Sequence, residues 1–122
     1  MKNYKKLVGA LGEDIAVKYL LKKNYKILER NFHCKLGEID IIAKEGAYIV
    51  FIEVKTRKNT NFGVPSEAVN YYKQKKIMQI AQYYLMVNKL NVNVRFDVIE
   101  IIAELKENKP LLKSIRLIKN AF

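Results

Sequence analysis

The 122 residues fit one domain, 1–122, and half of them are hydrophobic, so a core can form without disulfides or structural metals. The 23 Lys and Arg against 12 Asp and Glu give a formal net charge of +11, which favours a polyanionic partner such as nucleic acid over a merely well-solvated surface. Because Cys34 is the only cysteine and His33 the only histidine, an internal disulfide and a multi-histidine zinc site are excluded, and the lone thiol suits a cytoplasmic location.

The first element that the sequence predicts is an amphipathic helix over residues 4–22. Its apolar residues recur at helical spacing: Val8, Leu11, Ile15, Tyr19 and Leu20. The opening apolar stretch reaches only Gly12 before Glu13 and Asp14 interrupt it, which is too short for a signal-peptide core. No run approaches the length of a membrane span, so we expect no membrane partner.

Three strands follow in the prediction, over residues 25–33, 38–43 and 48–57. Gly37 opens the second strand, and Glu45-Gly46 is typical of a hairpin between the second and third. The middle of the third strand is almost wholly apolar, which is typical of a central strand covered on both faces.

The second half of the chain predicts one long helix and two strands. Residues 58–65 are polar with Gly63 and Pro65, which indicates a loop, and Ser66 is a suitable N-cap for a helix that runs to Val87. Residues 92–103 and 112–118 predict strands joined by a turn over 106–110. The order excludes a TIM barrel and a doubly wound Rossmann sheet, and it predicts an α/β mixed sheet flanked by helices.

Two carboxylates stand in apolar strands on either side of the predicted hairpin. Asp40 lies six residues before Gly46 and Glu53 seven residues after it, so antiparallel pairing places them almost opposite each other. Lys55 shares a strand face with Glu53, since residues two apart along a strand point the same way. Buried carboxylates side by side need a compensating cation.

Mg²⁺ or Mn²⁺ would supply that cation, because these hard ions take one or two carboxylates together with waters and a substrate phosphate. Asp40 and Glu53 would bind the metal, and Lys55 would position the attacking water or neutralise developing charge on a phosphodiester. The alternative is structural: a Glu53–Lys55 pair, with Asp40 hydrogen-bonded in a turn. A single Glu-x-Lys tripeptide is common by chance, but the upstream Asp on a paired strand makes the combination specific.

The arrangement of Asp40 and Glu53-Val54-Lys55 resembles the PD-(D/E)XK nuclease superfamily. The surrounding sequence is similar to the bacterial YraN-like proteins, which in turn resemble archaeal Holliday-junction resolvases. The resemblance implies a restriction-endonuclease-like core in the order α-β-β-β-α-β, with a short extra C-terminal strand here. The matching segments are Gly12-Glu13-Asp14, Arg30-Asn31, Gly37-Glu38-Ile39-Asp40-Ile41-Ile42, Val50 to Arg57, Ala68-Val69, Lys73-Gln74 and Arg95-Phe96-Asp97-Val98.

The resemblance also implies supporting residues. Glu13 matches a helix-one glutamate that approaches the metal in resolvase-like relatives, with a solvated helix acid as the alternative. Gln74 matches a position near the site in several superfamily members. Lys73 and Lys76 share a helix side and would grip phosphates unless they form only a solvated basic face.

Other charged and aromatic residues lie near the same segments. Arg57 and Lys58 would extend the positive track along the third strand. We expect Glu38 to be structural and Asp97 to pair with a Lys or Arg instead of ligating metal. The tyrosines at 71, 72, 83 and 84 would stack on unpaired bases or pack in the core, and their helical spacing favours packing.

The sequence thus predicts a Mg²⁺- or Mn²⁺-dependent DNA endonuclease, with selectivity for branched DNA as the resemblance implies. The alternative is a nucleic-acid-binding module that keeps the nuclease fold without turnover. Paired carboxylates favour the enzyme, because a pure binder of polyanions has no use for them. The choice between DNA and RNA stays open. Branched-DNA enzymes of this fold often form homodimers, although no segment here marks a dimer surface.

Overall fold

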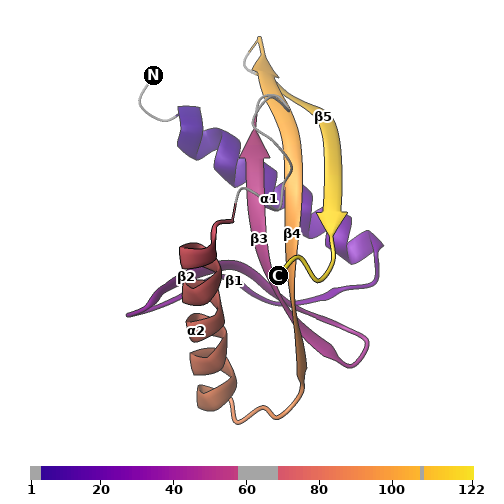
Figure 1. Ribbon diagram of the computed structural model, residues 1–122. Coiled ribbons are helices and arrows are strands. Elements are labelled where there is room, and N and C mark those ends of the chain that lie inside the picture. The colour runs from indigo at the N-terminus through magenta and orange to yellow at the C-terminus, as the bar shows by residue number, and fades with distance from the viewer. Residues whose placement is uncertain (1–3, 58–68, 108) are drawn as a thin grey trace.

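The computed structural model describes residues 4–57, 69–107 and 109–122. Their elements follow in the order α1 (Tyr4–Lys22), β1 (Lys26–Cys34), β2 (Gly37–Glu45), β3 (Tyr48–Arg57), α2 (Tyr71–Val87), β4 (Asn93–Lys106) and β5 (Lys109–Ile118) (Figure 1). This order confirms the predicted fold class, a mixed α/β sheet with flanking helices. Among these described residues, no helix is long and apolar enough to cross a membrane.

The five strands form one sheet in the order β1-β2-β3-β4-β5. Neighbouring strands are antiparallel except β3 and β4, which run parallel and are joined through α2. Helices α1 and α2 cover opposite faces of the sheet (Figure 1). Val50 and Ile52 of β3 pack under α1, whereas Ile49 and Phe51 pack under α2, so β3 is covered on both faces as predicted.

Three predicted boundaries were wrong. Helix α2 begins at Tyr71 instead of just after Ser66, because Asn70 is its N-cap and accepts the Lys73 N–H on its side-chain oxygen at 2.9 Å. Ser66 and the predicted loop 58–65 lie outside the described residues. Strand β4 extends to Lys106 instead of Ala103 and β5 begins at Lys109 instead of Leu112, because the ladder between them continues to the pair Lys106 and Lys109.

Helix α1 comes close to β3 at Gly12. A Cβ atom at this position would lie within 3.2 Å of all three side-chain heavy atoms of Thr56, so rotating the threonine cannot relieve the contact. This close approach seats α1 on the sheet and fixes where the next residue, Glu13, lies. Gly9, one turn earlier on the same helix, has no atom within 4 Å of its Cβ position.

We expect Gly12→Ala to lower the free energy of unfolding by roughly 1–2 kcal/mol, because overpacking against Thr56 outweighs the gain in helix propensity. Gly9→Ala, the matched control, should raise that free energy by about 0.5–1 kcal/mol, since only helix propensity changes there. Urea unfolding followed by circular dichroism measures both variants. Equal stabilisation by the two substitutions would show that α1 does not rest on Thr56.

A buried ion cluster ties the far end of the sheet together. The Arg95 guanidinium donates to both carboxylate oxygens of Asp97 at 2.9 Å and to Glu45 Oε1 at 2.7 Å. Tyr25 donates its hydroxyl to Asp97 Oδ2 at 3.1 Å, and Asp97 is fully buried. The prediction that Asp97 pairs with a Lys or Arg is confirmed. Burial and the Asp97 charge raise the pKa of Tyr25, so this phenol keeps its proton.

Breaking this cluster should be costly. We expect Asp97→Ala to lower the free energy of unfolding by about 3–5 kcal/mol, because it leaves the Arg95 charge half-buried with one carboxylate fewer. On the same strand, Glu104 forms a solvent-exposed ion pair with Lys113, whose Nζ lies 3.2 Å from Glu104 Oε1. Glu104→Ala should therefore lower the free energy of unfolding by no more than about 1 kcal/mol. Thermal denaturation of the two variants compares these costs, and similar losses would contradict a stabilising role for Asp97.

Candidate active site

The predicted pairing of Asp40 with Glu53 is confirmed by the register of the β2–β3 hairpin. The ladder ends at the pair Ile41 and Ile52, and the next residues along the two strands are Asp40 and Glu53. Asp40 Oδ2 accepts the N–H of Val54 at 2.8 Å, which fixes the carboxylate against β3. Glu53 is only 5% exposed. Two acidic side chains thus lie together at the point where β3 leaves the core.

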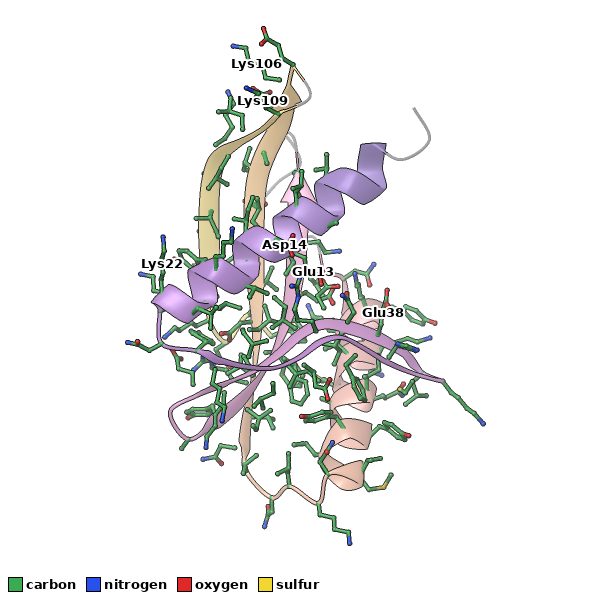
Figure 2. All side chains as sticks on the ribbon, turned by 180° about the vertical axis from the view of Figure 1, so that it is seen from behind. Glu13, Asp14, Lys22, Glu38, Lys106 and Lys109 are labelled. Atoms are coloured by element: carbon green, nitrogen blue, oxygen red, sulfur yellow. The ribbon has the colours of Figure 1, made fainter. Side chains whose placement is uncertain are left out.

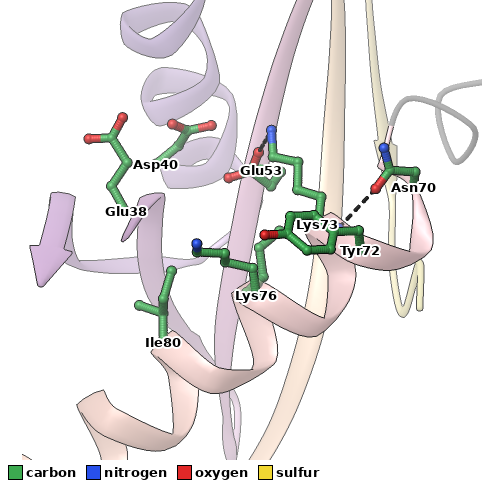
Figure 3. A pocket seen from close by; sticks show the side chains of 9 residues that line it. Glu38, Asp40, Glu53, Asn70, Tyr72, Lys73, Lys76 and Ile80 are labelled. Atoms are coloured by element: carbon green, nitrogen blue, oxygen red, sulfur yellow. Dashed lines mark hydrogen bonds and ion pairs between the residues drawn. The ribbon is translucent and has the colours of Figure 1, made fainter. Parts of the chain in front are cut away.

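Lysines offset part of this negative charge. Lys73 Nζ of α2 lies 2.9 Å from Glu53 Oε2 (Figure 3). Burial and, after it, the neighbouring Lys73 lower the pKa of Lys55. Burial also disfavours the charge on Lys73, but contacts with Lys55 and Glu53 outweigh it and raise the pKa of Lys73. The predicted phosphate-gripping Lys73 is therefore directed at a carboxylate in this arrangement.

The environment of Asp40 favours the protonated form of its carboxyl group. Burial, followed by the charge of Glu53 and more weakly that of Glu13, raises the pKa of Asp40 to about 7, against the opposing effects of the Val54 N–H and Lys73. Raised carboxyl pKa values of this size are typical of functional sites, although structural ion networks also produce them. A cation close to Asp40 would lower this pKa, because it would favour the charged form of the carboxyl group.

Glu13 contributes to this field from α1, near the middle of the helix (Figure 2). Its Oε1 atom is buried and accepts no hydrogen bond, with Arg30 3.7 Å away and already bonded to Asp14 at 2.7 Å. An unsatisfied buried carboxylate oxygen is costly and commonly marks an absent ion or water. Glu13 is thus a source of negative charge beside Asp40 with capacity to accept a further donor or cation.

The structure does not assemble Glu13, Asp40 and Glu53 as a set of three ligands. Within the described ranges, no group of three or more His, Cys, Asp or Glu side chains could hold a metal ion. Glu13 belongs to the helix on the opposite face from α2, and its carboxylate is turned toward Arg30. Mg²⁺ does not require a complete protein cage, because it keeps several waters and uses one or two carboxylates with substrate phosphates.

An open pocket of about 460 Å³ exposes the acidic pair to solvent between the β2–β3 hairpin and α2 (Figure 3). This volume falls within the roughly 300–1,000 Å³ range of ligand sites. The Glu38 side chain, which was expected to be structural, lines the pocket on the same side as Asp40. The lining residues are Glu38, Asp40, Glu53, Asn70, Tyr72, Lys73, Lys76, Ile77 and Ile80.

Of the other predicted site residues, some line the pocket and others do not. Lys76 lines the pocket, as a phosphate-binding residue should. Gln74 does not, because its side-chain amide donates to the Val69 carbonyl at 2.8 Å and holds the chain that leads into α2. Arg57 is directed at Glu100, with its Nε 3.9 Å from Glu100 Oε2. Lys58 lies outside the described residues.

Sequence reasoning missed Glu100 and Asn70. Glu100 is buried on β4 and pairs in register with Lys55, so it adds a further acid behind the lysine. The signal was available, since Ile99-Glu100-Ile101 sets a carboxylate inside an apolar run just as Ile39-Asp40-Ile41 does. Asn70 was hidden because its role depends on where α2 begins.

Comparison with known sequences places this arrangement in a family. The sequence profile described as "Uncharacterised protein family UPF0102" matches residues 12–101. The chain belongs to the UPF0102 family. A UPF0102 protein from Caldanaerobacter subterraneus subsp. tengcongensis is 53% identical over 97% of this chain and 96% of its own length. A UPF0102 protein from Clostridium kluyveri is 53% identical over 100% of this chain and 98% of its own length. One from Acetivibrio thermocellus is 50% identical over 99% of this chain and 95% of its own length.

The UPF0102 match includes every residue of the candidate site. Residues 12–101 contain Glu13 of α1, the acidic pair and the lysines of β3 and α2. The extra strand β5 lies beyond the matched range. The family assignment confirms the predicted relationship to the YraN-like proteins and names no activity.

The raised pKa of Asp40 predicts a pH dependence. Between about pH 4 and pH 7 the folded chain holds the Asp40 proton while the unfolded chain releases it, so metal-free stability should fall as pH rises through this window. Asp40→Asn removes the titration and keeps an oxygen for the Val54 N–H. The stability of wild type minus that of Asp40→Asn should therefore decrease from pH 4 to 7 and then level off. Urea unfolding at several pH values measures it, and a constant difference would contradict the raised pKa.

Proposed function

We propose that this UPF0102 protein is a Mg²⁺- or Mn²⁺-dependent DNA endonuclease that hydrolyses phosphodiester bonds. The observation that carries the proposal is the acidic pair of half-buried Asp40 and buried Glu53, which lines a pocket on a chain of net charge +11. A polyanion-binding surface gains nothing from paired carboxylates unless a cation joins them to the substrate phosphate.

The donor set fits a hard divalent ion. Asp40 and Glu53 present carboxylate oxygens, and the unsatisfied Glu13 oxygen beside them supports a need for more positive charge. Asp40 and Glu53 would hold the ion, which would activate water and polarise the phosphoryl oxygens. Lys55 would then donate hydrogen bonds to the water or the phosphate, and Lys76 would hold a flanking phosphate at the pocket.

Lys73 has a distinct part in this proposal. In the metal-free protein its ammonium neutralises Glu53 at 2.9 Å, which keeps the buried carboxylate tolerable. If Glu53 bound a divalent ion, Lys73 would no longer be needed as its counter-charge and would be available to substrate phosphates at the pocket that it lines. Lys73 would thus hold Glu53 before loading and contact nucleic acid afterwards.

The same ion pair favours the second candidate function, a nucleic-acid-binding module without turnover. If Lys73 satisfies Glu53 permanently, the site needs no metal, and the described residues contain no three-ligand group that would compete. The basic chain would then hold DNA or RNA through its phosphates alone.

Cleavage assays separate the two functions. Linear, flapped and four-way branched DNA are incubated with the pure protein in Mg²⁺ or Mn²⁺. We expect cleavage by wild type, and we expect Asp40→Ala and Glu53→Ala to lower the rate more than about 100-fold, because even partners behind metal ligands are worth about 10- to 100-fold.

Asp14→Ala is the matched control, since it removes an exposed α1 carboxylate that pairs with Arg30 outside the pocket. This variant should cut at the wild-type rate. Equal cutting by wild type and Asp40→Ala would place the activity elsewhere, and binding without any cutting would favour the module. Calorimetric titration with Mn²⁺ measures metal binding directly. Wild type should release or absorb heat as it binds Mn²⁺, and Glu53→Ala should show no binding.

A further inference from the structure

Tyr72 is the most exposed large apolar side chain of α2, with 74% of its surface open to solvent. Core or boundary packing was expected for the four tyrosines of this helix, and Tyr84 meets that expectation through edge-on contacts with Phe32 and Phe51. The expectation is wrong for Tyr72, because the residue lies in the first turn of α2, before the helix face that packs on the sheet begins at Ile77. An aromatic ring kept in water at a pocket has a free face for a ligand.

The surroundings of Tyr72 determine what ligand suits it. Its ring lines the same pocket as the acidic pair and lies on the α2 side, beside Lys73 and Lys76 (Figure 3). Ile77 and Ile80 supply apolar lining deeper along the helix. The wall therefore combines an aromatic face, two cations and an apolar patch. A nucleotide offers the matching groups, a flat base and an anionic phosphate.

We propose that Tyr72 stacks on an unpaired base of the nucleotide next to the phosphate held at Asp40 and Glu53, so the preferred substrate has single-stranded nucleotides at the cut. In a continuous duplex both faces of each base are covered by neighbouring base pairs, and a protein ring reaches a face only where the base is unpaired or flipped out. This inference rests on the proposed function for the position of the phosphate, but the stacking itself requires only binding.

Tyr71 provides an internal control for this inference. It is adjacent in sequence and 70% exposed, yet it does not line the pocket. Lys75 Nζ lies 4.9 Å from the centroid of its ring, so one face is already occupied by a cation. Two neighbouring tyrosines of nearly equal exposure thus differ in whether they face the acidic pair.

The test measures binding of fluorescein-labelled oligonucleotides by anisotropy, in EDTA and in Ca²⁺, with full-length protein. The probes are a blunt duplex, the same duplex with a 5′ flap and the flap strand alone. Wild type should bind the flapped and single-stranded probes more tightly than the blunt duplex. Tyr72→Ala should weaken these two about tenfold and leave the duplex unchanged, because stacking on one base is lost.

Tyr72→Phe keeps the aromatic ring and should bind all three probes with wild-type affinity. Tyr71→Ala should also bind them with wild-type affinity. A 2-aminopurine base in the flap next to the junction should change its fluorescence on binding to wild type and Tyr72→Phe but not to Tyr72→Ala. Equal affinity of wild type for flap and duplex, or equal losses in the two alanine variants, would overturn the inference. Circular dichroism melting establishes that the variants are folded.

The outcomes separate this inference from the proposed function. Asp40-dependent cutting without any effect of Tyr72→Ala would reject base stacking and keep the nuclease. Binding that depends on Tyr72 without cutting in Mg²⁺ or Mn²⁺ would reject the nuclease and keep the stacking site. Absence of binding to all three probes would reject both.

Discussion

The candidate site depends on the burial of β3 between two helices. Val50, Phe51 and Ile52 are covered by α1 on one face or α2 on the other, and burial declines from Val54 to Arg57 as the strand leaves the core. Glu53 is the first charged residue of the strand and lies where this coverage ends. The apolar segment before it fixes the register with β2, and that register brings Asp40 to the same place. A one-residue slip would turn Glu53 toward the opposite face.

Much of this could be predicted from the sequence, because local pattern and pairing geometry were sufficient. The hairpin at Gly46 and the alternation of apolar residues determine the β2–β3 register, and with it the juxtaposition of Asp40 and Glu53. The start of α2 could not be predicted in the same way. Ser66 and Asn70 are both acceptable N-caps, and only the seating of Val69 in the core decides in favour of Asn70.

The parts of the site that were missed depend on contacts between distant elements. Lys73 was identified as a basic residue, but its contact with Glu53 depends on how α2 crosses the end of β3. The position of Tyr72 at the pocket depends on the same crossing of α2 over β3, so the sequence pattern alone predicted packing for it. Periodicity gives the face of a helix and not the angle at which that face meets the sheet, so side chains in a first turn are the hardest to assign.

The proton and Lys73 compete for the carboxylates of the pocket, and under the proposed function a divalent ion would be a third competitor. Partial burial and the charge of Glu53 raise the pKa of Asp40 to about 7, so this carboxyl holds a proton below that pH. Lys73 neutralises Glu53 at 2.9 Å but acts on Asp40 only weakly, so Asp40 keeps its proton below about pH 7. A divalent ion supplies two charges at one point and could replace both. Its affinity should therefore rise with pH as the competing proton is lost, which follows from the pairing of two acids on adjacent strands.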